Sequence, residues 1–142
     1  MANAQRIMTL YDVPMWESIE RRKMALPRCS ACGTFRYPPG PICAECNALD
    51  YEWAEVSGNG TILSWVVFHR QYFDDHPQPY NAIAVRLAEG PIVVSNLVGD
   101  EPDGSWIGER VTITYRRHLD RLQHAFTLQN QKSTQLNRGE DA

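Results

Sequence analysis

The chain has 142 residues, which suits one ordinary domain or two small ones, and 43% of its residues are hydrophobic. Its 14 Lys and Arg residues are outnumbered by 17 Asp and Glu, and the net charge of −3 argues against a nucleic-acid binder, which needs a basic patch. Because the sequence shows neither an apolar stretch of about 18 residues nor a secretory leader, we expect a cytoplasmic protein that does not bind membranes.

The first predicted element is a short helix from Pro14 to about Met24, with Asp12 as its candidate N-cap. Its apolar stripe is thin and includes Trp16 and Ile19. A helix this short and polar is marginal alone, so it must dock on the rest of the chain or on another protein. We favour another protein, because Trp is a common interface anchor, and Trp16 and Ile19 are therefore candidate partner contacts.

Four cysteines follow in two pairs of identical spacing: Cys29, Cys32, Cys43 and Cys46. Two intervening residues let one tight turn present both sulfurs of a pair to a single ion. Two such turns complete a tetrahedron of ligands at about 2.3 Å from zinc. The second cysteines are followed by Gly33 and Asn47, residue types that readily adopt the positive φ such a turn needs. The pattern predicts a zinc ribbon.

Other chemistry for the cysteines is less consistent with the pattern. Disulfides are rare in the cytosol, and a redox dithiol needs only one pair. Iron in a rubredoxin-like site has the same ligand set, and the spacing does not distinguish it from zinc. Four protein ligands leave no position for substrate, so we interpret the metal as structural. The ion then supplies folding energy, on the order of 10–16 kcal/mol in small zinc peptides.

The rest of the chain alternates like β-strands, first at Tyr51–Val56 and then in five further segments. These are Thr61–His69, Ala82–Ala88, Pro91–Val98, Arg110–Arg117 and Gln123–Leu128. Five short antiparallel strands favour an OB-like closed barrel, because closure removes exposed edges; a small open sandwich is the alternative.

We therefore expect a mainly β protein in four parts. They are an N-terminal helical segment (1–26), a rubredoxin-like zinc ribbon (27–56), a five-stranded OB-fold barrel (57–130) and a disordered tail (131–142).

The segment between the first two barrel strands is rich in aromatic and proline residues. Tyr72, Phe73 and Tyr80 lie in it or at its end. Aromatic side chains on a loop are a candidate partner surface. The alternative is that they fold back and cap the barrel, and the sequence favours neither.

A cluster of arginines follows the fourth barrel strand: Arg116, Arg117 and Arg121. Guanidinium groups bind phosphates well, so this cluster could receive a phosphate or an acidic partner. A solvated hairpin turn is the simpler interpretation of the same residues.

No catalytic motif is visible, whether a phosphate-binding loop, a nucleophile elbow or a dinucleotide fingerprint. The run Asp74-Asp75-His76 is expected to be a solvated acidic turn, because adjacent loop residues seldom converge on one point. We expect surface or rim positions for all four histidines: His69, His76, His118 and His124.

The order of these motifs resembles the acyl-CoA-associated zinc-ribbon/OB-fold family, known as domain of unknown function 35. The resemblance extends over about residues 12–130, through the two cysteine turns, Ser57-Gly58-Asn59-Gly60-Thr61-Ile62 and Ile107-Gly108. It implies a non-catalytic accessory subunit of a thiolase-like enzyme: a thiolase, an acyltransferase, or a retro-aldolase of steroid side-chain or other lipid or aromatic degradation.

The same resemblance implies a heterotetramer or larger complex in which the partner carries the catalytic residues. The small subunit would stabilise that partner and help to form its acyl-CoA site, with acyl-CoA at or near the shared interface. Two alternatives stay open. One is a single-stranded nucleic-acid-binding module, a role that zinc ribbons and OB barrels also serve. The other is a free-standing acyl-CoA-binding protein. For either acyl-CoA role, the candidate ligands of the coenzyme A phosphates are Arg116, Arg117 and Arg121.

Overall fold

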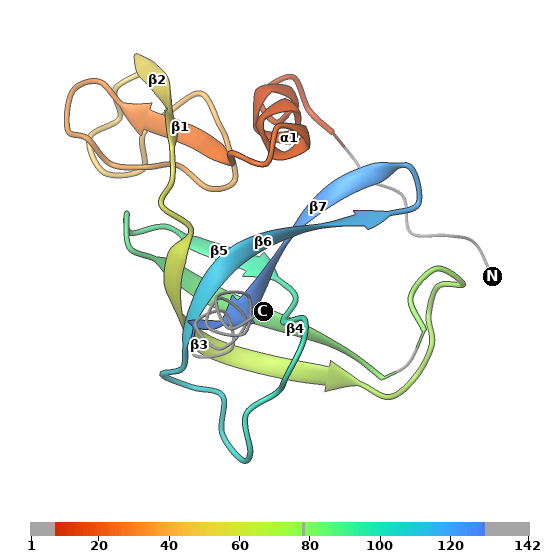
Figure 1. Ribbon diagram of the computed structural model, residues 1–142. Helices are drawn as coiled ribbons and strands as arrows, with labels where there is room; N and C mark the ends of the chain where they lie inside the picture. The colour runs from red at the N-terminus through yellow and green to blue at the C-terminus, as the bar shows by residue number, and fades with distance from the viewer. Residues whose placement is uncertain (1–7, 78, 130–142) are drawn as a thin grey trace, which may run out of the picture.

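The computed structural model describes residues 8–77 and 79–129 and consists mostly of strands with one short helix (Figure 1). The predicted disordered tail, residues 131–142, lies outside the described residues. The elements are α1 (Val13–Glu20), β1 (Ala25–Cys29), β2 (Tyr51–Glu55), β3 (Asn59–Phe68), β4 (Tyr80–Leu87), β5 (Ile92–Ser95), β6 (Arg110–His118) and β7 (Arg121–Leu128). Within the described part of the chain, no helix is long and apolar enough to span a membrane.

Helix α1 ends at Glu20, four residues before the predicted end. Arg22 adopts a left-handed φ of 59°, and the amide of Lys23 donates to the carbonyl of Ser18 at 3.0 Å. This arrangement is a Schellman cap, which satisfies the last carbonyls of the helix and reverses the chain. The segment after the cap has good helix formers, but the chain needs the reversal to begin β1.

The apolar face of α1 packs on the chain's own barrel. Met15 and Ile19 are buried, and Trp16 stacks on His124 of β7 with ring centroids 6.0 Å apart. For Ile19 the expectation of a partner contact is therefore wrong, whereas Trp16 is only half-buried. Ile19, with no exposed surface, is not available to a partner.

The ribbon is a two-stranded antiparallel sheet of β1 and β2, in which Ala25 faces Glu55 and Cys29 faces Tyr51. It lies beside α1 and above the barrel (Figure 1). Beyond β2, Gly58 brings the chain close to β6, and its carbonyl accepts a hydrogen bond from the amide of Ile113 at 2.8 Å. This bond fixes the ribbon at the rim of the barrel.

The barrel is one five-stranded sheet with the order β5-β4-β3-β6-β7. A parallel bridge between Leu97 and Phe126 joins its two edges, and the amide of Val98 donates to the carbonyl of Phe126 at 2.9 Å. This closure confirms the predicted OB-fold barrel over the open sandwich. Fully buried apolar side chains fill the interior: Ile62, Ile83, Val85, Val93, Val111 and Phe126.

Three polar contacts tie the N-terminal segment to β1 and the barrel. The Tyr115 hydroxyl accepts the amide of Met24 at 2.8 Å, and a Glu20 carboxylate oxygen accepts the amide of Leu122 at 2.9 Å. The buried Ser18 hydroxyl accepts the amide of Ala25 at 2.9 Å. A buried amide without a partner is costly, so these side chains fix where the helix and ribbon sit.

Candidate functional site

The two cysteine turns are built alike. In the first, the amide of Gly33 donates to the carbonyl of Cys29 at 2.9 Å, and in the second the amide of Asn47 donates to the carbonyl of Cys43 at the same distance. Gly33 has a φ of 79° and Asn47 a φ of 63°, as the sequence predicts. The positive φ at each position lets the chain turn tightly around the two sulfurs of its own cysteine pair.

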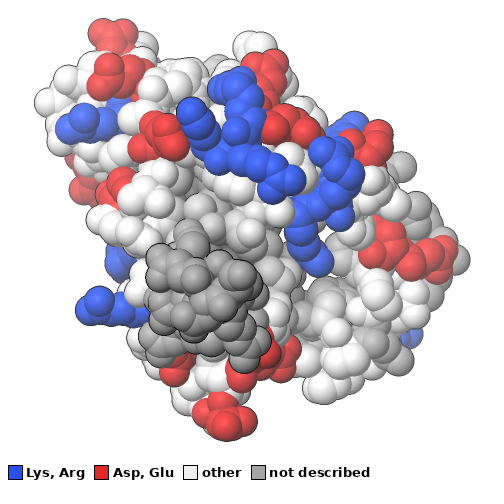
Figure 2. Space-filling model, in the orientation of Figure 1, with Lys and Arg blue, Asp and Glu red and all other residues white. Residues whose placement is uncertain are grey.

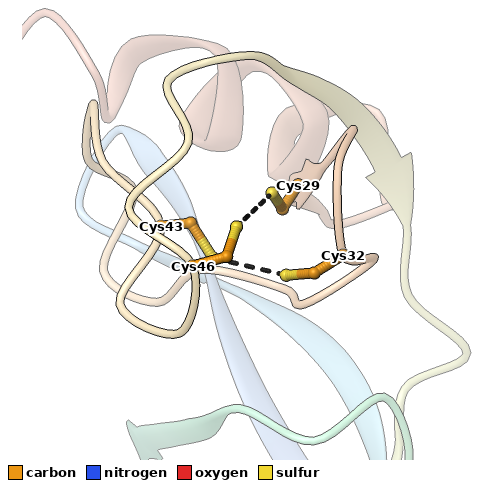
Figure 3. Close-up of side chains that lie close together, drawn as sticks. All are labelled: Cys29, Cys32, Cys43 and Cys46. Carbon is orange, nitrogen blue, oxygen red and sulfur yellow. Dashed lines mark hydrogen bonds between the residues drawn. The ribbon is translucent and has the colours of Figure 1, made fainter.

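The four cysteine side chains point toward one another at the end of the ribbon (Figure 3). The sulfurs of Cys29 and Cys46 are 3.6 Å apart, as are those of Cys32 and Cys43, and all four lie within 4.8 Å of one another. Four sulfurs placed tetrahedrally at about 2.3 Å from zinc would be separated by about 3.8 Å. The cluster therefore fits a structural zinc ion.

The thiols of this cluster differ in acidity. The backbone amide of Cys32 lowers the pKa of Cys29 to about 6. The amide of Ala48 lowers the pKa of Cys46, but sulfur contacts with Cys29 and Cys32 outweigh it and raise that pKa to about 12. A zinc ion would displace the protons of all four thiols, because it binds thiolates.

Arg36 braces the loop between the two turns, a role that the sequence does not reveal. It is buried, and its guanidinium donates to the carbonyls of Gly40 at 3.1 Å and Ala48 at 3.2 Å. It also lies over the ring of Tyr51, 4.7 Å from the centroid. One side chain therefore holds both sides of the ribbon in place.

The aromatic residues of the β3–β4 loop and of the start of β4 differ in how far they are exposed. Tyr80 stacks on Phe68 with centroids 4.8 Å apart, so it covers the barrel end. Tyr72 and Phe73 remain 50% and 40% exposed, although the edge of Tyr72 contacts Phe68. These two form a small aromatic surface on a loop held by its neighbours.

The three arginines do not converge. Arg116 and Arg117 are successive residues of β6, so their side chains point to opposite faces. Arg116 donates to the Asn96 side-chain oxygen at 3.2 Å, whereas Arg117 is exposed and lies 3.9 Å from a carboxylate oxygen of Glu20. Arg121 is exposed at the start of β7. A single phosphate cannot contact all three.

Lys and Arg side chains nevertheless gather over the end of α1 and the β6–β7 hairpin, with acidic groups among them (Figure 2). Arg22 belongs to this region, because its guanidinium donates to the carbonyl of Tyr115 at 3.5 Å. The net charge of −3 conceals this local concentration, which forms only when the fold brings α1 onto the hairpin.

One polar cluster contradicts the sequence-based expectation. Asp75 was expected in a solvated acidic turn, but its side chain is only 4% exposed. One of its oxygens lies 2.8 Å from Nε2 of His118, and the other lies 3.3 Å from Nδ1 of His76. His118 is far away in the sequence, so only the fold reveals that these residues meet.

His124 is a second correction, since it is buried rather than at the surface. Its Nδ1 lies 2.7 Å from the hydroxyl of Ser95, which also donates to the carbonyl of His124. Both residues are buried, and Trp16 covers the imidazole ring. This pair has the residue types of a nucleophile and base but no surface for a substrate, so it joins β5 to β7.

Two family models match consecutive parts of the chain. Residues 16–52 match the rubredoxin-like zinc ribbon domain of ChsH2, and residues 53–116 match the ChsH2 C-terminal OB-fold domain. A solved structure described as an Ltp2-ChsH2(DUF35) aldolase contains a chain that superposes with a TM-score of 0.79 at 30% identity. The match covers 87% of this chain and 98% of that one.

Curated relatives fall into two groups. A DUF35 domain-containing scaffold protein of Methanocaldococcus jannaschii is 31% identical over 74% of this chain and 77% of its own length. A probable enoyl-CoA hydratase alpha subunit of Thermomonospora curvata is 37% identical over 73% of this chain. The match covers 33% of that subunit, so the chain corresponds to about a third of it. The chain therefore belongs to the DUF35 family, with a ChsH2-type zinc ribbon followed by an OB-fold domain.

Proposed function

We propose that this chain is a non-catalytic accessory subunit of a thiolase-like acyl-CoA enzyme, which it stabilises and whose acyl-CoA site it helps to form. The observation that carries the proposal is the match, at 30% identity over 98% of its length, to a chain of the Ltp2-ChsH2 aldolase. That protein is described as an aldolase assembled with a DUF35 chain. The thiolase-like class of the partner follows from the family resemblance.

In this proposal the zinc ion is structural and Cys29, Cys32, Cys43 and Cys46 are its ligands. The sulfur spacing supports this assignment, because it approaches that of a zinc tetrahedron. When bound, zinc closes the ribbon and leaves no coordination position for substrate. The ion therefore stabilises the folded subunit and takes no part in the chemistry.

The non-catalytic role is supported by how two groups of reactive side chains are placed within residues 8–77 and 79–129. The cysteines converge on the metal site. The Ser95–His124 pair lies beneath Trp16, away from solvent. We therefore assign the catalytic groups to the partner.

The surface proposed for the partner combines Tyr72 and Phe73 with the neighbouring basic hairpin. Both aromatic rings are substantially exposed, and such rings are common interface anchors. Trp16 is a weaker candidate, because its ring already stacks on His124.

Arg117 and Arg121 are exposed and are suited to the phosphates of an acyl-CoA bound at the shared interface. Acidic groups interrupt the basic region, as Glu20 does beside Arg117. A few phosphates of one cofactor suit this surface better than a long polyanion.

A hydratase subunit is a second candidate partner, because the Thermomonospora curvata relative bears that name. In that case this chain would serve a dehydrating or hydrating enzyme rather than a carbon–carbon bond-cleaving one. The accessory role of the chain is the same in both cases.

Co-expression tests the proposal. This chain should be produced with any thiolase-like protein encoded beside it and, separately, with any neighbouring hydratase subunit. We expect one stable complex, seen as co-elution in size-exclusion chromatography with light scattering. Separate elution from both candidates, with full activity of each alone, would overturn the accessory role. A complex with the hydratase alone would select the second candidate.

A further inference from the structure

The loop between β3 and β4 meets the β6–β7 hairpin at a group of three potential metal ligands: Asp75, His76 and His118. The carboxylate of Asp75 lies between the two imidazoles, 2.8 Å from Nε2 of His118 and 3.3 Å from Nδ1 of His76. One ligand atom from each residue lies within 4.8 Å of the others. The ribbon cysteines form a separate group and share no residue with it.

The two histidines are not equally satisfied. Nε2 of His118 forms a hydrogen bond with Asp75, whereas Nδ1 of His76 is buried and has no hydrogen-bond partner. Its 3.3 Å contact with the Asp75 carboxylate is not a hydrogen bond, and a buried imidazole nitrogen without one is unfavourable unless something else binds it. An ion between the two imidazoles and the carboxylate would satisfy it.

We propose that Asp75, His76 and His118 bind a divalent transition-metal ion of the zinc class, at a second site distinct from the ribbon. Two imidazole nitrogens and one carboxylate are a donor set that such ions accept, with water completing the coordination. The present spacing requires only small side-chain movements, because ligand atoms around one zinc ion lie about 3.4 Å apart in a tetrahedron.

The surroundings allow an ion to enter. A cavity of about 420 Å³ adjoins the group and is lined also by Asn96 and Arg116. The side chains of His76 and His118 are 24% and 19% exposed, so solvent reaches them. The positive charge of Arg116, which is held by Asn96, opposes a cation, and we expect this site to bind more weakly than the four thiolates.

The ion would join two segments that are distant in the sequence. Asp75 and His76 belong to the loop that also carries Tyr72 and Phe73, whereas His118 ends β6. Metal binding would hold the exposed aromatic residues against the barrel. The inference concerns the isolated chain and does not depend on the proposed partner.

Metal stoichiometry tests the site. The full chain, purified with its ribbon zinc, is equilibrated with excess Zn²⁺, passed through a desalting column equilibrated in the same free Zn²⁺, and analysed for metal per chain. We expect one further ion for the wild type and none for His76→Ala, which removes no side-chain hydrogen bond and only the 3.3 Å contact with Asp75. His69→Ala, a nearby exposed histidine outside the group, should keep the further ion.

Co²⁺ provides a second readout. Thiolate charge-transfer absorption reports the ribbon, whereas an ion at the second site adds d–d bands without that absorption. The second-site bands should be present in the wild type and absent from His76→Ala and His118→Ala, with the thiolate absorption unchanged in all three. A wild type that binds no further ion, or variants that bind as much as the wild type, would overturn the proposal.

Discussion

Gly58 joins the ribbon to the barrel, and replacing it with alanine tests how tightly the two are connected. A Cβ atom built on Gly58 would lie 2.1 Å from Cγ2 of Ile113. The Ile113 amide is bonded to the Gly58 carbonyl at 2.8 Å, so the two backbones cannot separate without breaking that bond. The residue also has a φ of 85°, which disfavours any L side chain.

The cost of Gly58→Ala has two parts. Placing alanine in the left-handed region costs about 1–2 kcal/mol, and forcing a methyl group into a packed position costs about 1–3 kcal/mol. We therefore expect a loss of about 2–5 kcal/mol in the free energy of unfolding. Gly104→Ala is the matched control, because Gly104 has a φ of 77° and its Cβ would meet no atom within 4 Å.

Urea denaturation followed by circular dichroism measures both variants, at one fixed free zinc concentration because metal binding is linked to folding. Backbone strain and the change in unfolded-state entropy are common to the two substitutions. The difference between them therefore isolates the contact with Ile113. Equal destabilisation by the two substitutions would refute the packing argument.

Three further predictions concern the metal, the core and the partner surface. Cys32→Ala should lose its zinc and most of its soluble expression, and near-stoichiometric zinc in metal analysis of that variant would refute the four-thiolate site. Ser18→Ala removes the acceptor of the first amide of β1 and should lower the free energy of unfolding by about 1–3 kcal/mol. An unchanged denaturation midpoint would contradict this, because it would mean that another group accepts the amide equally well. The double substitution Tyr72→Ala and Phe73→Ala should weaken partner binding at least about tenfold in calorimetry while leaving the melting temperature nearly unchanged, with the exposed Ile107→Ala as the control.

The ribbon and the barrel could be predicted because their signals are local. Two residues between paired thiols fix a metal-binding turn, and Gly33 and Asn47 supply the positive φ it needs. The barrel strands can be recognised from the alternation of apolar and polar residues and from the turn residues between them. Closure by the Leu97–Phe126 bridge is not local, but exposed sheet edges are unfavourable enough to make a closed barrel the expected solution.

The end of α1 could not be predicted, because tertiary contacts override helix propensity there. The residues after Glu20 favour a helix, yet the reversal at Arg22 lets Ser18 accept the first amide of β1 and Tyr115 accept the amide just before it. The docking of Ile19 follows from the same reversal, which lays the helix on β7.

The Asp75 cluster was also missed, for a different reason. Adjacent loop residues carry no signal of which distant strand they will face. The closed barrel and the twist of the β6–β7 hairpin bring His118 to the β3–β4 loop. Only there is His118 close enough to Asp75 for a hydrogen bond to form. A sequence pattern can identify such residues as candidate ligands, but only the fold shows that they lie together.

The proposed accessory role is tested most directly by the activity of the proposed thiolase-like partner, measured with and without this chain. The partner, produced alone, is titrated with the purified chain while acyl-CoA turnover is followed. The account predicts that turnover rises from a low basal level and saturates at the stoichiometry of the complex. Full turnover by the partner alone, unchanged by added chain, would contradict it.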